Sequence, residues 1–190
     1  MMKKTLLAGI AFLFCTGAAP STPLLCAVPQ HAPASGPVIP QAYGYTAVPG
    51  VAVKPDPHKI YRAIFSATAA ADKPASLLPA ILMAATELNT LAAYGVPLSN
   101  TRYVIDFHGP GAVYGLLDNA HYRQKFGTDN PNLPVLAELK KAGVKLYVCS
   151  QQMLAMGVGF NTISPDVTVA SDGLFVLVNF QDQGYAFLPF

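Results

Sequence analysis

Residues 144–158 have the sequence VKLYVCSQQMLAMGV, and this stretch decides the class of fold. Its first five residues are mostly apolar, β-branched or aromatic, which predicts a short buried strand. Cys149 follows that strand, and residues 150–156 predict a helix that begins directly after the cysteine. A buried strand followed at once by a helix is the repeating unit of a parallel α/β sheet.

The same alternation of strands and helices continues on both sides of this stretch. Strands are predicted at 60–65, 103–107, 144–148, 167–170 and 185–188, and helices at 76–94, 113–119, 132–142, 150–156 and 173–181. Helices between strands make βαβ units, which join parallel strands by helical crossovers. The sequence therefore predicts an α/β fold with a three-layer, open and mainly parallel sheet of about five strands, covered by helices on both faces.

The N-terminus has the pattern of a secretory signal peptide. Lys3 and Lys4 make it positive, and the apolar stretch from Leu6 to Phe14 is too short to span a bilayer as a helix. Small residues predict cleavage after Ala18, and cleavage after Ala27 is the alternative. No later run reaches the roughly 20 apolar residues of a membrane span. We therefore expect a periplasmic protein with no membrane segment after signal cleavage.

Composition divides the rest of the chain into two regions. Residues 19–57, after the predicted signal peptide at 1–18, are rich in proline, which blocks helices and predicts a flexible or extended leader. Tyr43 and Tyr45 in this leader have an alternative role as contacts for a neighbouring subunit. Residues 58–190 form one α/β domain of ordinary size.

The overall composition excludes two classes of protein. Apolar residues make up 52% of the 190-residue chain and charged residues 12%, which excludes a disordered or highly charged protein. The formal net charge of +2 includes Lys3 and Lys4 of the predicted signal, so the mature chain is close to neutral. A neutral chain without a basic stripe predicts no nucleic-acid partner.

Cys149 is the candidate catalytic residue. Cys15 lies in the predicted signal and Cys26 is retained only with the earlier cleavage site, so the cysteines do not form a disulfide framework. Amide donors at the start of the next helix favour the thiolate form of Cys149, which is the form that attacks sulfane sulfur. Inert packing of a buried thiol is the alternative.

His108, which follows the predicted strand at 103–107, is the second candidate. Its imidazole stabilises a thiolate if its strand neighbours that of Cys149, whereas a hydrogen bond to a loop backbone is the alternative. Glycines next to it let the backbone turn or approach a ligand closely. The candidate ligand-cleft residues are Gly109, Gly111, Ser150 and Gln151. Because the GxGxxG, GxxxxGK[ST], HExxH, GxSxG and CxxC patterns are all missing, we predict no cofactor and no metal ion.

Four blocks of sequence lie in a fixed order along the predicted domain. They are residues 107–111 (FHGPG), 130–132 (NPN), 144–158 and 181–189 (QDQGYAFLP). The third block resembles the cysteine segment of the DsrE/DsrF-like sulfur-relay family, in which an apolar strand, a cysteine, a short helix and a Gly-Val or Gly-Ile pair follow in that order. The other blocks are similar to one branch of this family. The resemblance covers residues 59–190, the whole predicted domain.

The resemblance implies a three-layer α/β fold, assembly into homotrimers or hexamers, and a cysteine that carries persulfide sulfur. Cys149 matches that cysteine, whereas Ser150 departs from the glycine that this branch often has there. The implied function is a periplasmic sulfur carrier that accepts sulfane sulfur on Cys149. Its partners would be a sulfur donor and a sulfur acceptor that the sequence does not identify.

Two other functions stay open at this point. One is a non-catalytic oligomeric module that binds a small ligand in the strand-end cleft, with Cys149 merely buried. The other is a thiol redox role in which Cys26 is the partner of Cys149. Cleavage beyond Cys26 would remove the thiol needed for an internal disulfide, so the mature N-terminus separates the redox role from the other two.

Overall fold

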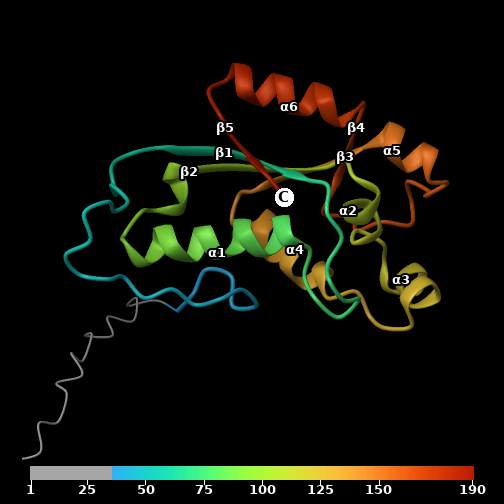
Figure 1. Cartoon of the computed structure of the whole chain (residues 1–190), viewed down its shortest axis with the longest axis horizontal. Helices are drawn as coiled ribbons and strands as arrows, with labels where there is room; N and C mark the ends of the chain where they lie inside the picture. Colours follow the sequence, from blue (N-terminus) through green and yellow to red (C-terminus); the bar gives the residue numbers. More distant parts are fainter. Residues whose placement is uncertain (1–35) are drawn as a thin grey trace, which may run out of the picture.

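The computed structural model describes residues 36–190 and has a three-layer α/β fold (Figure 1). Its five strands are all parallel, in the order β4-β3-β2-β1-β5. The strands are β1 (Tyr61–Ala67), β2 (Thr101–Phe107), β3 (Lys145–Cys149), β4 (Thr168–Ala170) and β5 (Ala186–Pro189). The predicted fold class, an open parallel sheet of an α/β protein, is confirmed.

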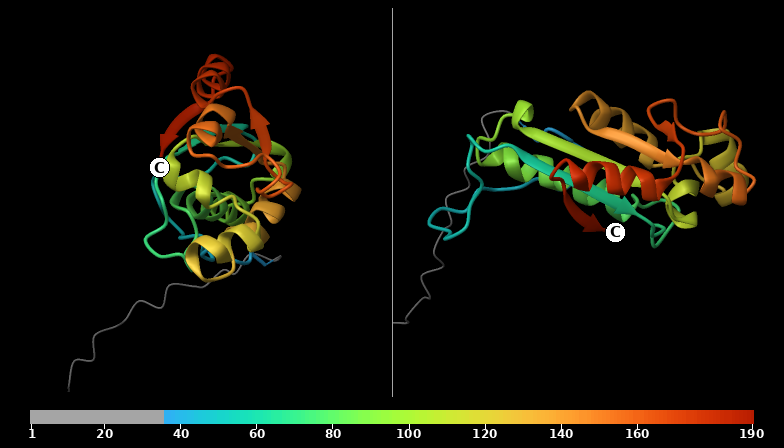
Figure 2. Two further views of the ribbon diagram at one scale, coloured as in Figure 1. Left: turned by 90° about the vertical axis from the view of Figure 1, so that its right-hand side faces the viewer. Right: turned by 90° about the horizontal axis from the view of Figure 1, so that it is seen from above.

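Helices cover both faces of this sheet. The long helices α1 (Pro79–Ala93) and α4 (Asn132–Lys141) lie on one face, and α6 (Gly173–Asp182) lies on the other (Figures 1 and 2). The short helices gather at one end of the sheet (Figure 1) and are α2 (Pro110–Tyr114), α3 (Asn119–Phe126) and α5 (Ser150–Ala155), while a 3-10 turn spans Leu98–Asn100. Within residues 36–190, no helix combines the length and apolar character needed to cross a membrane.

Strand residues alternate between two cores, one on each face of the sheet. The smaller core lies between the sheet and α6 and consists of Ile64, Val104, Val176, Leu177 and Phe180. Successive side chains of a strand point to opposite faces. Ser66 and Asp106, two residues beyond Ile64 and Val104, therefore also point to the α6 side. The apolar layer under α6 thus becomes polar toward the carboxyl ends of the strands.

The connection between β2 and α4 differs from the prediction. The sequence predicts one helix over 113–119, whereas the structure has two, α2 beginning at Pro110 and α3 beginning at Asn119. Proline fits the first turn of a helix, where its missing N–H needs no partner. The Asp118 carboxylate caps α3 by accepting a hydrogen bond from the His121 N–H at 2.9 Å.

The described part of the Pro-rich leader, residues 36–57, is not free of the domain. Ile39 is fully buried, and the Asn89 side chain on α1 accepts from its N–H at 2.9 Å and donates to its carbonyl at 3.0 Å. Asn89 also donates to the Tyr43 carbonyl at 3.1 Å. Proline blocks helix formation but leaves an extended backbone able to pack, and here an amide side chain pairs with it. The predicted signal peptide, both cleavage sites and Cys26 lie outside the described residues.

Candidate functional site

The carboxyl ends of β2 and β3 form the candidate functional site. Parallel pairing sets Phe107 opposite Val148, so the following residues, His108 and Cys149, stand at the same edge of the sheet. Both side chains line a pocket of about 490 Å³. Ligands of open parallel sheets bind at this edge. The structure therefore brings together the two residues that the sequence singled out.

Residues from two helices complete the pocket. They are Gln151 and Gln152 of α5, and Asp172, Gly173 and Leu174 at the start of α6. The chain reaches this place because α6 joins β4 to β5 across the sheet, and its first turn lies beside the ends of β2 and β3. The Asp172 carboxylate caps α6 by accepting from the Phe175 N–H at 2.7 Å. The pocket thus has amide and carboxylate groups around the thiol.

Cys149 ends β3 and is also the N-cap of α5. Its Sγ accepts a hydrogen bond from the Gln152 N–H at 3.3 Å. The residue is 7% exposed, and it is the only cysteine of residues 36–190. An amide donor aimed at sulfur stabilises negative charge on it. The thiol therefore lies at the wall of the pocket, with little of its surface open to solvent.

His108 is held at the ring nitrogen Nε2. This atom lies 2.8 Å from the Ser66 hydroxyl oxygen and 4.0 Å from Oδ2 of Asp106. The side chain is 19% exposed, and burial lowers the pKa of His108 below its ordinary value. The imidazole is therefore mostly neutral at neutral pH and available to accept a proton.

Asp106 is a buried carboxyl beside this imidazole. It has no exposed surface, and neither of its oxygens has a hydrogen-bond partner within residues 36–190. Burial raises the pKa of Asp106 to about 7, and the charge of Asp172 contributes to the rise. Asp106 therefore changes its charge near neutral pH, unlike an ordinary aspartate.

Gly173 lets the start of α6 lie directly on His108 and Asp106. A Cβ at this position would stand 2.5 Å from Cβ of His108 and 3.0 Å from Oδ2 of Asp106. Such distances leave no room for a side chain at position 173. The absence of a side chain is therefore what allows α6 to cover the buried carboxyl.

The predicted cleft glycines lie elsewhere. Gly109 and Gly111 do not line the pocket of Cys149. A Cβ on Gly109 would lie 2.3 Å from the Thr68 carbonyl oxygen, and one on Gly111 would lie 2.4 Å from the Ala70 nitrogen. These glycines allow α2 to pack closely against the chain after β1, so the close approach predicted for a ligand is made to the protein's own backbone.

The two remaining predicted cleft residues occupy different positions around the pocket. Gln151 lines it, with Nε2 3.5 Å from the Ser150 hydroxyl oxygen. Ser150 does not line it; its hydroxyl donates to the Ser171 carbonyl at 2.6 Å. Ser150 therefore ties the start of α5 to the segment before α6 and supports the wall of the pocket.

Sequence reasoning missed Ser66, Asp106, Asp172 and Gly173. Asp106 is the one acidic residue in the otherwise apolar strand segment 103–107, which is a visible signal. A charged residue inside a strand that is buried on both faces has an unusual environment. Asp172 and Gly173 carry only the signal of a helix cap, because their place beside His108 depends on how α6 crosses the sheet.

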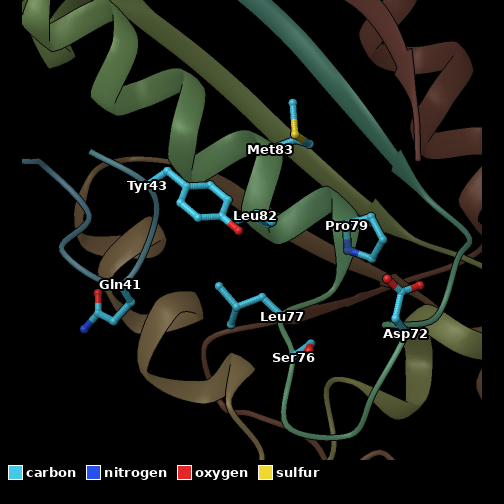
Figure 3. Close-up of a pocket in the computed structure, with 8 residues that line it drawn as sticks. All are labelled: Gln41, Tyr43, Asp72, Ser76, Leu77, Pro79, Leu82 and Met83. Carbon is cyan, nitrogen blue, oxygen red and sulfur yellow. The ribbon is translucent and has the colours of Figure 1, made fainter. Parts of the chain in front are cut away.

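A second pocket, of about 460 Å³, lies between the leader and α1 (Figure 3). Gln41 and Tyr43 of the leader line one side, and Pro79, Leu82 and Met83 of α1 line the other. Its lining residues include no cysteine or histidine. It offers two hydroxyls, an amide and the Asp72 carboxylate to a ligand but no nucleophilic sulfur, so the pocket of Cys149 is the better candidate for chemistry.

Within residues 36–190, no cluster of three or more His, Cys, Asp or Glu side chains has the geometry to hold a metal ion. At the site, Nε2 of His108 lies 4.0 Å from Oδ2 of Asp106. The chemistry available at this site from the described residues is that of a thiol, an imidazole and a carboxyl.

Comparisons with known proteins bear on the fold and on the family of the chain. None of the curated proteins compared with the chain matches it. A solved structure from Methanobacterium thermoautotrophicum, the protein of unknown function MTH1491, is similar with a TM-score of 0.51 and 22% identity, over 68% of this chain and 98% of that one. The ychN protein from E. coli is similar with a TM-score of 0.49 and 17% identity, over 69% of this chain and 100% of that one. The model of the DsrE/DsrF-like family matches residues 60–190, which include all five strands and the pocket of Cys149, and the chain belongs to this family.

Proposed function

We propose that this protein is an exported sulfur carrier in which Cys149 accepts sulfane sulfur as a persulfide. Membership of the DsrE/DsrF-like family suggests a function related to sulfur relay. The observation that carries the finer proposal is the position of the thiol. Cys149 Sγ stands at the carboxyl end of β3, accepts a backbone hydrogen bond from Gln152, and lines a pocket shared with His108.

The sulfur transfer needs one nucleophile and one leaving group. The Cys149 thiolate attacks the outer sulfur of a donor persulfide, R–S–SH, and a bond forms between Sγ and that sulfur. The donor's S–S bond breaks, and the donor leaves as the thiolate R–S⁻ with the electron pair. The product is Cys149–S–SH, and the transfer consumes no external oxidant or reductant. Passing the sulfur to an acceptor thiolate is the same step in the opposite direction.

His108 supports this step electrostatically. An imidazole in the same pocket accepts the thiol proton and, once charged, stabilises the thiolate. Gln151 and Gln152 of α5 also line the pocket and offer amide groups to the incoming donor.

The alternative is a non-catalytic module that binds a small ligand in the same pocket. The low exposure of Cys149, 7%, favours this alternative, because a sulfur carrier must meet its donor at the sulfur atom. In that case the thiol would be part of the wall, and the amide and carboxyl groups would bind the ligand.

Intact-mass measurement after exposure to inorganic polysulfide separates the two functions. We expect the native mature protein to gain about 32 Da, one sulfur atom, and to lose it on treatment with a reducing thiol. Cys149→Ser should show no gain, whereas Cys26→Ser, the matched control, should gain as the wild type does if the mature chain keeps Cys26. A wild-type protein that takes up sulfur only after denaturation would exclude the carrier and leave the binding module.

Export is part of the proposal and has its own test. The positive N-terminus followed by a short apolar stretch supports a cleaved signal peptide and a periplasmic location. We expect the purified mature protein to begin at Ala19. A start beyond Cys26 would exclude an internal disulfide and with it the thiol redox role. Uncleaved chain in the cytoplasm would exclude export.

Assembly is the third part of the proposal. Resemblance to the family implies a homotrimer or a hexamer, and the exposed apolar residues Leu174, Phe175 and Val178 on α6 support burial of that face in an oligomer. Light scattering of the native protein at micromolar concentration should give three or six times the mass of one chain. A monomer under these conditions would exclude this assembly.

A further inference from the structure

Asp106 exchanges no bond or proton in the proposed sulfur transfer, yet it is the most unusual polar group of the described structure. It is fully buried, and both carboxyl oxygens lack a hydrogen-bond partner within residues 36–190. Leaving a buried acceptor without a donor costs stability, so packing does not account for a carboxyl here. The position calls for a role in the pocket that it adjoins.

The surroundings of Asp106 limit what that role is. The titratable groups that face it are His108 directly after β2, Asp172 at the start of α6, and Tyr147 and Cys149 on β3. On β1 the neighbouring residue is the uncharged Ser66. No Lys or Arg of residues 36–190 forms an ion pair with Asp106. The imidazole of His108 is therefore the group that can supply a positive charge to this carboxylate.

The His108 ring is oriented by the same neighbours. Both Ser66 Oγ, at 2.8 Å, and Asp106 Oδ2, at 4.0 Å, lie on the Nε2 side of the ring. The other ring nitrogen, Nδ1, has no hydrogen-bond partner within the described residues. The Ser66 hydroxyl holds the ring through Nε2, and the Asp106 carboxyl lies on the same side beyond hydrogen-bond distance. The other nitrogen is thereby free for proton transfer.

We propose that Asp106 is a positioning residue whose carboxylate stabilises protonated His108 and so makes His108 the proton acceptor for the Cys149 thiol. This inference rests on the proposed role of Cys149 as the sulfur-accepting thiol. The Cys149 S–H proton passes to His108, Sγ attacks the outer sulfur of R–S–SH, and the donor's S–S bond breaks. The leaving R–S⁻ then takes the proton from His108. The sum is Cys149–SH and R–S–SH giving Cys149–S–SH and R–SH, with no change in the number of electrons.

The proposal predicts a pH dependence with a definite sign. Since burial raises the pKa of Asp106 to about 7, the carboxylate is present above that pH and is lost as the pH falls below it. Cys149 should therefore react faster above about pH 7, by roughly tenfold, because positioned proton acceptors contribute about 10²–10⁴ in rate and Asp106 acts only through His108.

The test is the rate of Cys149 alkylation by iodoacetamide across this pH range, read from the Cys149 peptide of the native mature protein. Wild type should show a step near pH 7 that Asp106→Asn and His108→Gln both lose. Asp182→Asn, which removes an exposed carboxyl at the end of α6, is the matched control and should keep the step. An Asp106→Asn protein with the wild-type profile would overturn the proposal.

A second measurement covers the case in which Asp106→Asn does not fold. Nuclear magnetic resonance of the His108 ring in folded wild type should show an inflection near pH 7, where Asp106 gains its charge. A His108 ring signal that is flat through this region overturns the coupling.

The two proposals fail separately. Persulfide on native Cys149 together with an unchanged Asp106→Asn profile would refute the role of Asp106 and keep the sulfur carrier. No persulfide together with a lost step would refute the carrier and keep the control of the thiol by Asp106 and His108.

Discussion

Replacing Asp106 by asparagine should make stability less dependent on pH. Burial raises the pKa of this carboxyl from its ordinary 3.8 to about 7, so the folded state holds a proton that the unfolded state releases between these values. The stabilising contribution of the neutral acid is complete below about pH 4 and is lost as the pH rises through about 7. Each pKa unit is worth about 1.36 kcal/mol, which gives a total of about 4 kcal/mol.

Between pH 5 and pH 8 this contribution changes by about 2–3 kcal/mol. Asparagine has the shape of aspartate and no charge to bury at either pH. We therefore compare the free energy of unfolding of Asp106→Asn with that of wild type at each pH. The difference, variant minus wild type, should be about 2–3 kcal/mol more positive at pH 8 than at pH 5. Urea denaturation followed by circular dichroism at both pH values measures this difference.

Asp182→Asn is the control for this measurement, because Asp182 is exposed. Its replacement should change the free energy of unfolding by the same amount at pH 5 and at pH 8. The comparison is made between variants at one pH, so titration of groups distant from Asp106 cancels to first order. If the difference between Asp106→Asn and wild type is the same at pH 5 and pH 8, Asp106 is not held neutral by burial, and the reasoning from its environment is refuted.

Two further substitutions test the packing around the site and the leader. Gly173→Ala should lower stability by about 1–3 kcal/mol, because its Cβ would stand 2.5 Å from Cβ of His108, whereas Gly44→Ala meets nothing within 4 Å and should be nearly neutral in thermal unfolding. Asn89→Ala should release the segment around Ile39, which loses both of its hydrogen bonds to Asn89. Limited proteolysis should then cut near residue 39 in the variant and not in the wild type, and equal rates of cutting would contradict this account.

The fold was predictable because each strand is a local signal. Apolar runs such as 103–107 and 144–148 lie within one strand, and a helix follows each of them in sequence, so the parallel sheet follows without knowledge of long-range contacts. The position of Cys149 at a strand end follows from the same local pattern. The start of α3 also carries a local signal, since Asp118 is a good N-cap, but the predicted helix at 113–119 did not use it.

The contacts of the glycines could not be predicted from the local sequence. A glycine allows close approach, but the sequence does not say what approaches it. Gly109 and Gly111 pack against the backbone of Thr68 and Ala70. Gly173, which the sequence predicts only as the start of a helix, packs against His108. The identity of the neighbour depends on the order of the strands and on the face to which each helix crosses. Neither property is encoded in the few residues around the glycine.

The composition of the α6 side of the sheet shows why the site lies at this edge. Ile64 and Val104 form an apolar layer under α6, and two residues further along the same strands Ser66 and Asp106 replace it with polar groups. A leucine or valine at position 106 would extend the layer and avoid the cost of a buried carboxyl without a partner. Compared with an apolar residue at this position, Asp106 therefore adds no stability to the fold. What the carboxyl does provide is a negative charge, available above about pH 7, within 4.0 Å of the imidazole that shares a pocket with Cys149.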